Sequence, residues 1–259
     1  MNGSSIKLIT LNTWGGRSLY PLMHFLRNKA EDTDIFCLQE VFDTDQTALD
    51  AFHQKEYVCG PLFKKMSDSL PDLKGAFACF KDNPHDMSLA LFVREKLATK
   101  TILDFLIYQQ TSSQEKGNWT LSSRKLQYVT LTNVSGNYTI VNFHGLWTGG
   151  SKTDTPERIE QSRTVKKFLD SIDGSKILCG DFNLLPDTES MHILERGMRN
   201  LVREAGIVST RTSLYRHYNN PNVPNFADYI LVSPEIHVQR FEVLPDLVSD
   251  HSPLLLEFS

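Results

Sequence analysis

Six stretches of this sequence place a carboxylate, an amide or a histidine where an apolar run ends. The polar residues at these ends are Asn12, Glu40, His144, Asp181 with Asn183, Asp228, and Asp250 with His251. One such end is an ordinary turn, but six in one chain are hard to attribute to turns. Carboxylate and amide oxygens suit Mg²⁺ or Mn²⁺, whereas a zinc site would need more His or Cys. The pattern therefore indicates metal-assisted attack of water on a phosphorus centre.

The stretch Leu178 to Asn183 carries two of these groups. An apolar strand runs into Gly180 and then presents the carboxylate of Asp181 and the amide of Asn183. Alternation along an extended chain would point both side chains to the same side. Taken alone, the stretch is equally typical of a simple turn, because Gly, Asp and Asn are common turn residues.

The other candidates also have structural alternatives when each is taken alone. Asn12 and Asp228 are typical turn or capping residues, and Glu40 is typical of a solvated strand end. His144 and His251 are each compatible with a structural or surface histidine. The functional interpretation depends on whether the fold brings these strand ends together.

Strands and helices must position these groups. Apolar or alternating runs predict strands at 6–11, 34–38, 76–80, 88–94, 101–108, 125–132, 138–143, 175–179, 228–232, 238–244 and 254–258. Helical spacing predicts helices at 19–30, 44–54, 156–172 and 189–196, with the cations of 156–172 mostly on a solvated face. Loops are expected at 55–75, 109–123 and 219–225, and 133–137 predicts a hairpin turn.

The whole chain of 259 residues shows no linker, repeat or low-complexity segment, so we expect one domain over residues 1–259. Strands mixed with a few helices, including hairpin-like neighbours, favour α/β layers with mixed sheets over a purely parallel sheet. The formal net charge of −4 weakens the case for a long non-specific grip on duplex nucleic acid, but it leaves room for a local basic groove.

The four cysteines show no Cys-x-x-Cys or Cys/His metal spacing. We interpret them as reduced thiols and expect a cytoplasmic, intracellular protein. The N-terminal residues lack a basic region followed by an apolar stretch, and no apolar run approaches the length of a membrane span. Neither secretion by a retained signal nor stable membrane insertion is expected, and no protein partner is implied.

Taken together, the motifs resemble the endonuclease/exonuclease/phosphatase superfamily, which has the deoxyribonuclease-like fold. The matching segments, which follow the family's order and run from residue 6 to residue 258, are Leu11–Trp14, Leu38–Val41, Asn142–Gly145, Gly180–Asn183, Asp228–Ile230 and Ser249–Pro253. The resemblance implies a four-layered α/β sandwich, with two facing mixed β-sheets flanked by helices. It also implies an active site along one edge of the sandwich.

The resemblance implies a role for each matching residue. Glu40 would be the principal metal ligand, with Asn12 and Asp250 close to the metal. Asp181 would orient or deprotonate the attacking water, and Asn183 would hydrogen-bond the scissile phosphate.

The two histidines complete this set. His251 would contact the phosphate or act as general base, with Asp228 fixing its tautomer. His144 would be a second phosphate contact or a proton donor to the leaving group. Arg124 could reach a substrate phosphate or be an ordinary surface arginine, and Trp14 and Trp147 could stack on a base or lipid-like group or pack at the rim.

The resemblance implies a Mg²⁺-dependent phosphodiester hydrolase, with nucleic acid or a nucleotide end as substrate. Trp14 stands where abasic-site endonucleases carry an acidic or amide residue, which disfavours that branch. The Trp14-Gly15-Gly16 continuation is similar to the mixed branch of sphingomyelinase-like and tyrosyl-phosphodiesterase-like members, so a phospholipid or small phosphate ester is an alternative substrate. A catalytically inactive binding module of the same fold is a third hypothesis, which the complete polar set disfavours.

Overall fold

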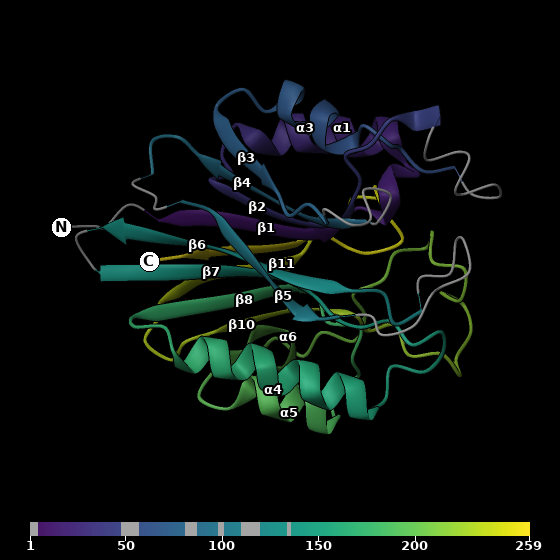
Figure 1. The fold of residues 1–259 in the computed structure, drawn as a ribbon, viewed down its shortest axis with the longest axis vertical. Coiled ribbons are helices and arrows are strands. Elements are labelled where there is room, and N and C mark those ends of the chain that lie inside the picture. Colours follow the sequence, from purple (N-terminus) through teal and green to yellow (C-terminus); the bar gives the residue numbers. More distant parts are fainter. Residues whose placement is uncertain (1–4, 48–56, 81–86, 98–100, 110–119, 134–135) are drawn as a thin grey trace.

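The fold is seen in a computed structural model that describes residues 5–47, 57–80, 87–97, 101–109, 120–133 and 136–259. In these residues two six-stranded mixed sheets face each other, and helices cover both outer faces (Figure 1). The predicted four-layered α/β sandwich is confirmed.

The first sheet has the strand order β11-β12-β1-β2-β4-β3. Its strands are β1 (Ile6–Asn12), β2 (Ile35–Val41), β3 (Leu73–Phe77), β4 (Ser88–Arg94), β11 (Val238–Val243) and β12 (Leu254–Phe258). β1 and β2 are parallel, and the other neighbours are antiparallel. A short 3-10 helix, η1 (Trp14–Gly16), follows β1, and helices α1 (Leu19–Ala30) and α3 (Leu62–Ser69) cover the outer face (Figure 1).

The second sheet has the order β5-β6-β7-β8-β10-β9. Its strands are β5 (Leu103–Tyr108), β6 (Arg124–Asn133), β7 (Gly136–His144), β8 (Ser175–Asp181), β9 (Arg199–Asn200) and β10 (Asp228–Val232). The crossover helix α4 (Pro156–Asp170) makes β7 and β8 parallel, as a long connection allows. Together with α5 (Glu189–Glu195) it covers the outer face, and the short α6 (Leu201–Glu204) follows β9 (Figure 1).

The apolar run of β1 is explained by burial of both its faces. Leu8 packs against apolar side chains of the facing sheet, whereas Ile9 packs on the other side, against the apolar cluster formed with α1 and α3. Burying one such side chain stabilises the fold by about 1.5–3 kcal/mol. At the next two positions on the same face as Leu8, the apolar pattern stops, and the buried side chains of Thr10 and Asn12 are polar. The polar residues therefore lie where the sheet core meets one edge of the sandwich.

The sequence prediction was wrong about the start of one strand and missed one helix. β3 begins at Leu73, not residue 76, and the predicted loop 55–75 contains helix α3. Leu62 and Met66 form its buried stripe, but no side chain caps its start at Pro61, so the sequence carries little helix signal there. Most of the helix predicted at 44–54, and most of the segment 109–123 with Trp119, lie outside the described residues.

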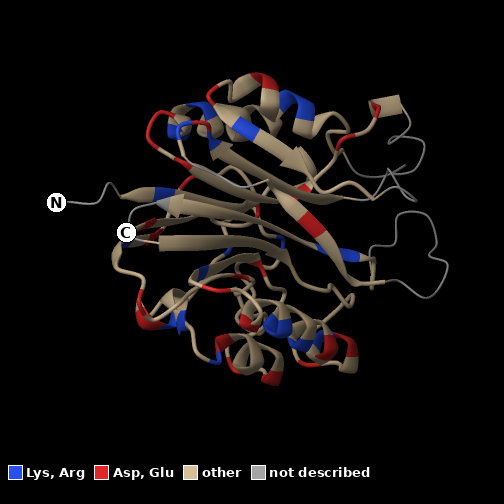
Figure 2. Cartoon of the chain, turned by 60° about the vertical axis from the view of Figure 1, so that its left-hand side comes forward, with Lys and Arg blue, Asp and Glu red and all other residues tan. Residues whose placement is uncertain are grey.

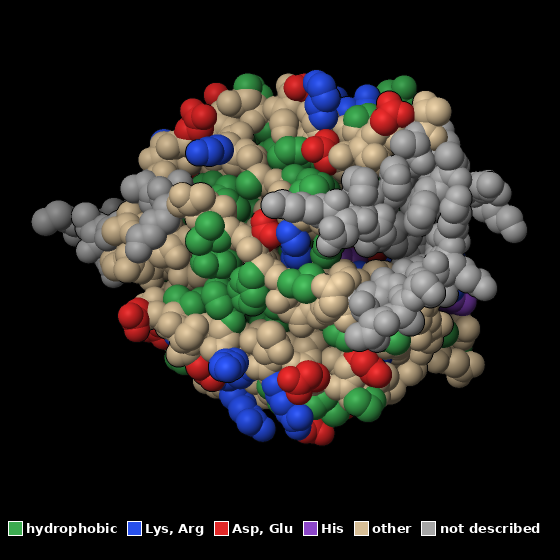
Figure 3. All heavy atoms as spheres, viewed as in Figure 1, with side chains coloured by type: hydrophobic (Ala, Val, Ile, Leu, Met, Phe, Trp, Pro, Cys, Tyr) green, Lys and Arg blue, Asp and Glu red, His purple; other side chains and the backbone are tan. Residues whose placement is uncertain are grey.

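The outer layers carry charges of both signs. Figure 2 shows Lys, Arg, Asp and Glu side by side on the helices and connecting loops. Hydrophobic side chains are also visible on the face in Figure 3, and Leu103 and Leu106 of the edge strand β5 are exposed. Within the described ranges, no helix combines the length and the apolar character needed to cross a bilayer.

Candidate active site

Three neighbouring strands of the second sheet reach the same edge at the same level, where β7 and β8 end and the antiparallel β10 begins. The register of β7 and β8 pairs His144 with Asp181, and that of β8 and β10 pairs Asp181 with Asp228. In the facing sheet, the last residue of β1, Asn12, pairs with Gln39 of β2. The fold thus brings side chains from five strands to one edge of the sandwich.

Two glycines allow this convergence. Gly180 has φ +138°, and an added Cβ would lie 2.0 Å from the carbonyl oxygen of Phe143 on β7. A Cβ on Gly145 would lie 2.0 Å from the carbonyl oxygen of Phe182, while its N–H donates to the Asp181 carbonyl at 2.8 Å. Only glycine permits such close backbone contact. The Gly-Asp pair at the end of β8 thus has a structural cause.

Asp181 lies at the centre of the site and is only 2% exposed. Its Oδ2 accepts a hydrogen bond from Nδ2 of Asn12 at 2.9 Å and lies 3.7 Å from Nε2 of His144 and 3.6 Å from Nε2 of His251. Its Oδ1 accepts the N–H of Asn183 at 2.9 Å. Burial opposes ionisation, but His251 and the other positive neighbours keep the pKa of Asp181 well below its usual value. The carboxylate is therefore charged and can orient a water as a hydrogen-bond acceptor.

His251 is held by Asp228 in one orientation. Nδ1 of His251 lies 2.9 Å from both carboxylate oxygens of Asp228, which leaves Nε2 facing Asp181 and, at 3.8 Å, Oδ1 of Asp250. Burial and Arg211 lower the pKa of His251, but the three carboxylates outweigh them and raise it above its ordinary value. His251 is therefore suited to carry a proton near neutral pH.

His144 has the opposite electrostatic character. Burial and the nearby Arg124 lower its pKa from 6.5 to about 3, although Asp181 acts in the other direction. Its imidazole is therefore neutral at physiological pH. The two histidines of the site differ in charge because only His251 has a carboxylate at hydrogen-bond distance.

This difference predicts a pH effect on folding in metal-free protein. Between pH 6.5 and about 3 the unfolded chain protonates His144 while the folded chain does not, so His144 lowers stability as the pH falls through this window. Between pH 6.5 and 4.5 we expect the wild type to lose about 2 kcal/mol more free energy of unfolding than His144→Gln does. Urea unfolding at several pH values with chelator measures this; parallel stability curves for the two proteins would contradict it.

Glu40 is turned toward the site by an irregularity in β2. The pairing of β2 with β4 shifts register between Leu38 and Val41, and Glu40 has φ +55°. Such a bulge re-aims a side chain out of the ladder. The hydroxyl of Thr13 fixes this shape by donating to the carbonyls of Gln39 and Glu40. Glu40 is 22% exposed at its side chain, lies 3.9 Å from His144, and has its pKa raised by burial.

Backbone strain is concentrated at this edge. Four non-glycine residues in the described ranges have positive φ, and three of them are Trp14, Glu40 and Asn183. All three are site residues predicted from the sequence. Left-handed conformations of this kind cost about 1–3 kcal/mol each and persist where the surroundings impose them, which is common at functional sites.

The donor set fits a divalent cation that prefers oxygen ligands. Two groups bring ligand atoms within 4.8 Å of one another: Glu40 with His144 and Asp181, and Asp181 with Asp228 and His251. Oδ1 of Asp250 is buried and has no hydrogen-bond partner among the described residues. An unpaired buried carboxylate oxygen is costly unless a cation binds it. Carboxylates dominate the set, as Mg²⁺ and Mn²⁺ sites require.

The remaining candidates lie beside this cluster. Arg124 is buried, and its guanidinium donates to the carbonyls of Gly145, Ser122 and Ser123, so it braces the loop after His144. Trp14 and Trp147 are half-buried in the segments that follow Asn12 and His144. The guanidinium of Arg17 lies 5.1 Å from the Trp14 ring centroid.

Four residues that sequence reasoning missed also belong to this region. Arg211 donates to Oδ2 of Asp250 at 2.8 Å, and Lys152 approaches the same group of carboxylates. Both lie in irregular segments with no pattern to single them out. Behind the site, Nε2 of Gln39 donates to Oδ1 of Asn142 at 2.7 Å, which joins the two sheets. Gln39 and Asn142 lie within two of the sequence motifs, and that position is what could have identified them as part of the site region.

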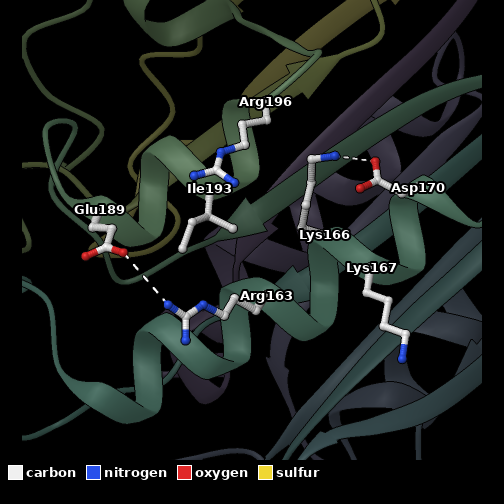
Figure 4. A pocket seen from close by; sticks show the side chains of 7 residues that line it. All are labelled: Arg163, Lys166, Lys167, Asp170, Glu189, Ile193 and Arg196. Carbon is white, nitrogen blue, oxygen red and sulfur yellow. Dashed lines mark hydrogen bonds and ion pairs between the residues drawn. The ribbon is translucent and has the colours of Figure 1, made fainter.

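A separate pocket lies between α4 and α5 (Figure 4). It is lined by Arg163, Lys166, Lys167, Asp170, Glu189, Ile193 and Arg196, none of them a predicted site residue. Lys166 pairs with Asp170, and Arg163 lies 4.0 Å from Glu189, so acidic neighbours offset part of the positive charge. Arg158 on the same helix was expected on a solvated face, but it is 2% exposed and bonded to loop carbonyls.

Comparisons with solved structures show the same fold. The chain matches an endonuclease/exonuclease/phosphatase from Bacteroides vulgatus with TM-score 0.73, 17% identity and 99% coverage of both chains. It matches a mannosyl-6-phosphatase of Bacteroides thetaiotaomicron with TM-score 0.66 and 20% identity, covering 98% of this chain and 99% of that one. TDP2 of D. rerio, complexed with a single-strand DNA product, matches with TM-score 0.65 and 14% identity, covering 99% and 100%.

The sequence itself identifies the family. The comparison with curated proteins found no matching sequence. The family model described as "Endonuclease/Exonuclease/phosphatase family", however, matches residues 9–251, which is nearly the whole chain and includes every predicted site residue. The chain therefore belongs to the endonuclease/exonuclease/phosphatase family, whose members are metal-dependent phosphoesterases, and it is a hydrolase that acts on ester bonds.

Proposed function

We propose that the protein is a Mg²⁺-dependent phosphodiester hydrolase that acts on nucleic acid or a nucleotide end. The observation that carries this proposal is the position of Asp181, whose Oδ2 faces Asn12, His144 and His251 within 3.7 Å. The charged carboxylate of Asp181 supplies a hydrogen-bond acceptor that orients water, and His251, whose pKa is raised, supplies a proton donor. Phosphodiester hydrolysis needs both groups.

Glu40, Asn12 and Asp250 would hold the metal. Oδ1 of Asn12 accepts one hydrogen bond, from the N–H of Trp14, and an amide oxygen has a second lone pair for a cation. Oδ1 of Asp250 has no donor among the described residues, and the Glu40 carboxylate is partly exposed. The ion would neutralise charge on a phosphate oxygen.

The protein's own groups would move the protons and bind the phosphate. Asp181 would orient the attacking water as a hydrogen-bond acceptor, because its low pKa keeps it ionised and Asn12 fixes one of its oxygens. His251, oriented by Asp228, would donate from Nε2 to a phosphate oxygen. Asn183 donates to the Gly145 carbonyl at 3.3 Å, and its amide has a second N–H for the phosphate. His144, whose imidazole is neutral at physiological pH, would contact the phosphate or serve the leaving group.

The substrate is tested with oligonucleotides labelled at the 5′ or 3′ end, single- and double-stranded. We expect cleavage in Mg²⁺ and none in chelator, and the product ladder would tell attack at an end from internal attack. A phospholipid or small phosphate ester is the second candidate, supported by the shared fold of the Bacteroides mannosyl-6-phosphatase. Untouched oligonucleotides together with turnover of such esters would replace the first candidate by the second.

Metal dependence provides a separate prediction. Chelator should abolish turnover and added Mg²⁺ should restore it, because Glu40, Asn12 and Asp250 offer the oxygen ligands that a divalent cation prefers. Losing even an outer-shell partner of a metal costs about 10–100-fold in affinity, so Glu40→Gln should raise the Mg²⁺ concentration for half-maximal activity at least as much.

The matched control is Glu242→Gln. The Glu242 side chain on β11 is 43% exposed and paired with Arg240, so its loss should leave the Mg²⁺ requirement unchanged. An unchanged Mg²⁺ requirement in Glu40→Gln would remove Glu40 from the proposed ligand set.

A further inference from the structure

Lys152 lies where two segments of the site meet. It belongs to the loop between β7 and α4, and its carbonyl accepts the N–H of Leu185 at 3.0 Å. Its ammonium donates to the carbonyl of Phe226 at 2.6 Å. Leu185 is two residues beyond Asn183, and Phe226 is two residues before Asp228. Lys152 is thus tied to both segments that carry the catalytic groups.

A buried arginine fixes the loop on both sides of Lys152. Nη1 of Arg158 donates to the carbonyls of Ser151 at 2.8 Å and Thr153 at 2.6 Å, and Nε donates to the carbonyl of Leu146 at 3.1 Å. The backbone at Lys152 is therefore held in place before any substrate arrives. Preorganisation of this kind is what a binding residue needs.

The ammonium of Lys152 has capacity left for a ligand. Among the described residues its hydrogen-bond partner is the Phe226 carbonyl, and no carboxylate there lies within the 4.0 Å of an ion pair. An ammonium group has three N–H donors, so two remain available. Burial and Arg211 lower its pKa to about 8 against the pull of Asp181 and its neighbours, so the group is charged at neutral pH.

The contacts of the Lys152 ammonium indicate which part of a substrate it would meet. The ammonium of Lys152 donates to the Phe226 carbonyl, two residues before Asp228, and forms no ion pair with the catalytic carboxylates in the described residues, so it lies beside that cluster and not within it. The guanidinium of Arg211 is already bound to Asp250. A phosphate bound beside the scissile one would accept hydrogen bonds from the two remaining N–H groups of Lys152, which its single bond to the Phe226 carbonyl leaves available.

We propose that Lys152 binds the phosphate that flanks the scissile phosphate, so that the preferred substrate is a nucleotide chain with at least two phosphates. This inference rests on the proposed phosphodiesterase function. Contacts of this type carry no base information, but they set the position of the strand. They also make binding depend on salt.

The test compares two substrates that differ by one phosphate. They are the p-nitrophenyl ester of thymidine 5′-phosphate and the same compound carrying a 3′-phosphate. For the wild type in Mg²⁺ we expect the second to have a KM about tenfold lower, since one good phosphate contact has an energy of this order. Lys152→Gln should raise that KM to the level of the first substrate with kcat little changed, and Lys152→Arg should keep the preference.

A binding measurement reads the same contact without turnover. Anisotropy of a labelled single-stranded oligonucleotide in chelator should give a salt dependence whose slope is smaller by about 0.7 in Lys152→Gln, as for one lost phosphate contact on a single strand. Lys167→Gln, an exposed lysine on α4, is the matched control and should bind like the wild type.

The outcomes separate the two proposals. Equal KM values and equal salt slopes in wild type and Lys152→Gln, or the same change in Lys167→Gln, would overturn the role of Lys152 and leave the proposed function standing. A wild type that hydrolyses neither ester and no oligonucleotide would overturn the proposed function, whereas the salt slope would still report whether Lys152 binds phosphate. Lys152→Arg retains the charge, so a KM preference lost there as well would also contradict the inference.

Discussion

Asp181→Asn is expected to lower kcat by about 10³-fold or more, because general acid–base catalysis contributes about 10²–10⁴-fold and this carboxylate is also the centre of the site. The substitution keeps the shape of the side chain, and its amide oxygen can still accept the N–H of Asn183. It removes the negative charge between His144 and His251. The measurement is steady-state hydrolysis in Mg²⁺.

Asp187→Asn is the control for this prediction. Its carboxylate lies six residues further along, is 82% exposed and pairs with Arg203 on the surface. Surface pairs contribute little to stability, and this one lies outside the cluster, so kcat should be unchanged. Wild-type kcat in Asp181→Asn would remove the proposed mechanism, and matching thermal unfolding of the two variants would exclude misfolding as the cause of a loss.

Gly180→Ala is expected to have the largest effect on stability, a loss of about 3 kcal/mol or more. The new methyl group would lie 2.0 Å from the backbone oxygen of Phe143, and φ +138° is a conformation that side chains other than glycine rarely adopt. Relief of the clash would have to separate β7 from β8, which would also part His144 from Asp181. Urea unfolding measures the loss of stability.

Gly150→Ala provides the comparison, because an added Cβ there meets no atom within 4 Å. This variant should unfold within about 0.5 kcal/mol of the wild type, as ordinary surface substitutions do. If Gly180→Ala behaved in the same way, the close approach of β7 and β8 would not be what fixes the register at the site.

The sequence predicted the strand ends well because burial on both faces leaves a clear mark. Runs such as Ile6 to Leu11 are apolar throughout, and their polar ends stand out. The geometry at Asn183 differs from the prediction of alternation. β8 ends at Asp181, and Asn183 adopts φ +52°, so its N–H folds back onto the carboxylate. The stretch is a turn and a candidate site at once.

Local pattern could not reveal groups whose position depends on tertiary contacts. Lys152 and Arg211 lie in loops without periodicity, and they reach the site because Arg158 and Asp250 hold them there. The bulge at Glu40 is likewise visible only once β2 pairs with β4. The roles of the site residues, the single domain over residues 1–259 and the cytoplasmic location stay predictions.

Hydrolysis in ¹⁸O-labelled water tests the central claim most directly. With Mg²⁺ and the substrate that the wild type cleaves fastest, we predict one ¹⁸O in the phosphate product and none in the released alcohol, because the water that Asp181 orients attacks phosphorus. Mass spectrometry of both products gives the answer, and Asp181→Asn provides the background. Label in the alcohol, or no metal-dependent hydrolysis of any phosphate ester tested, would contradict the account.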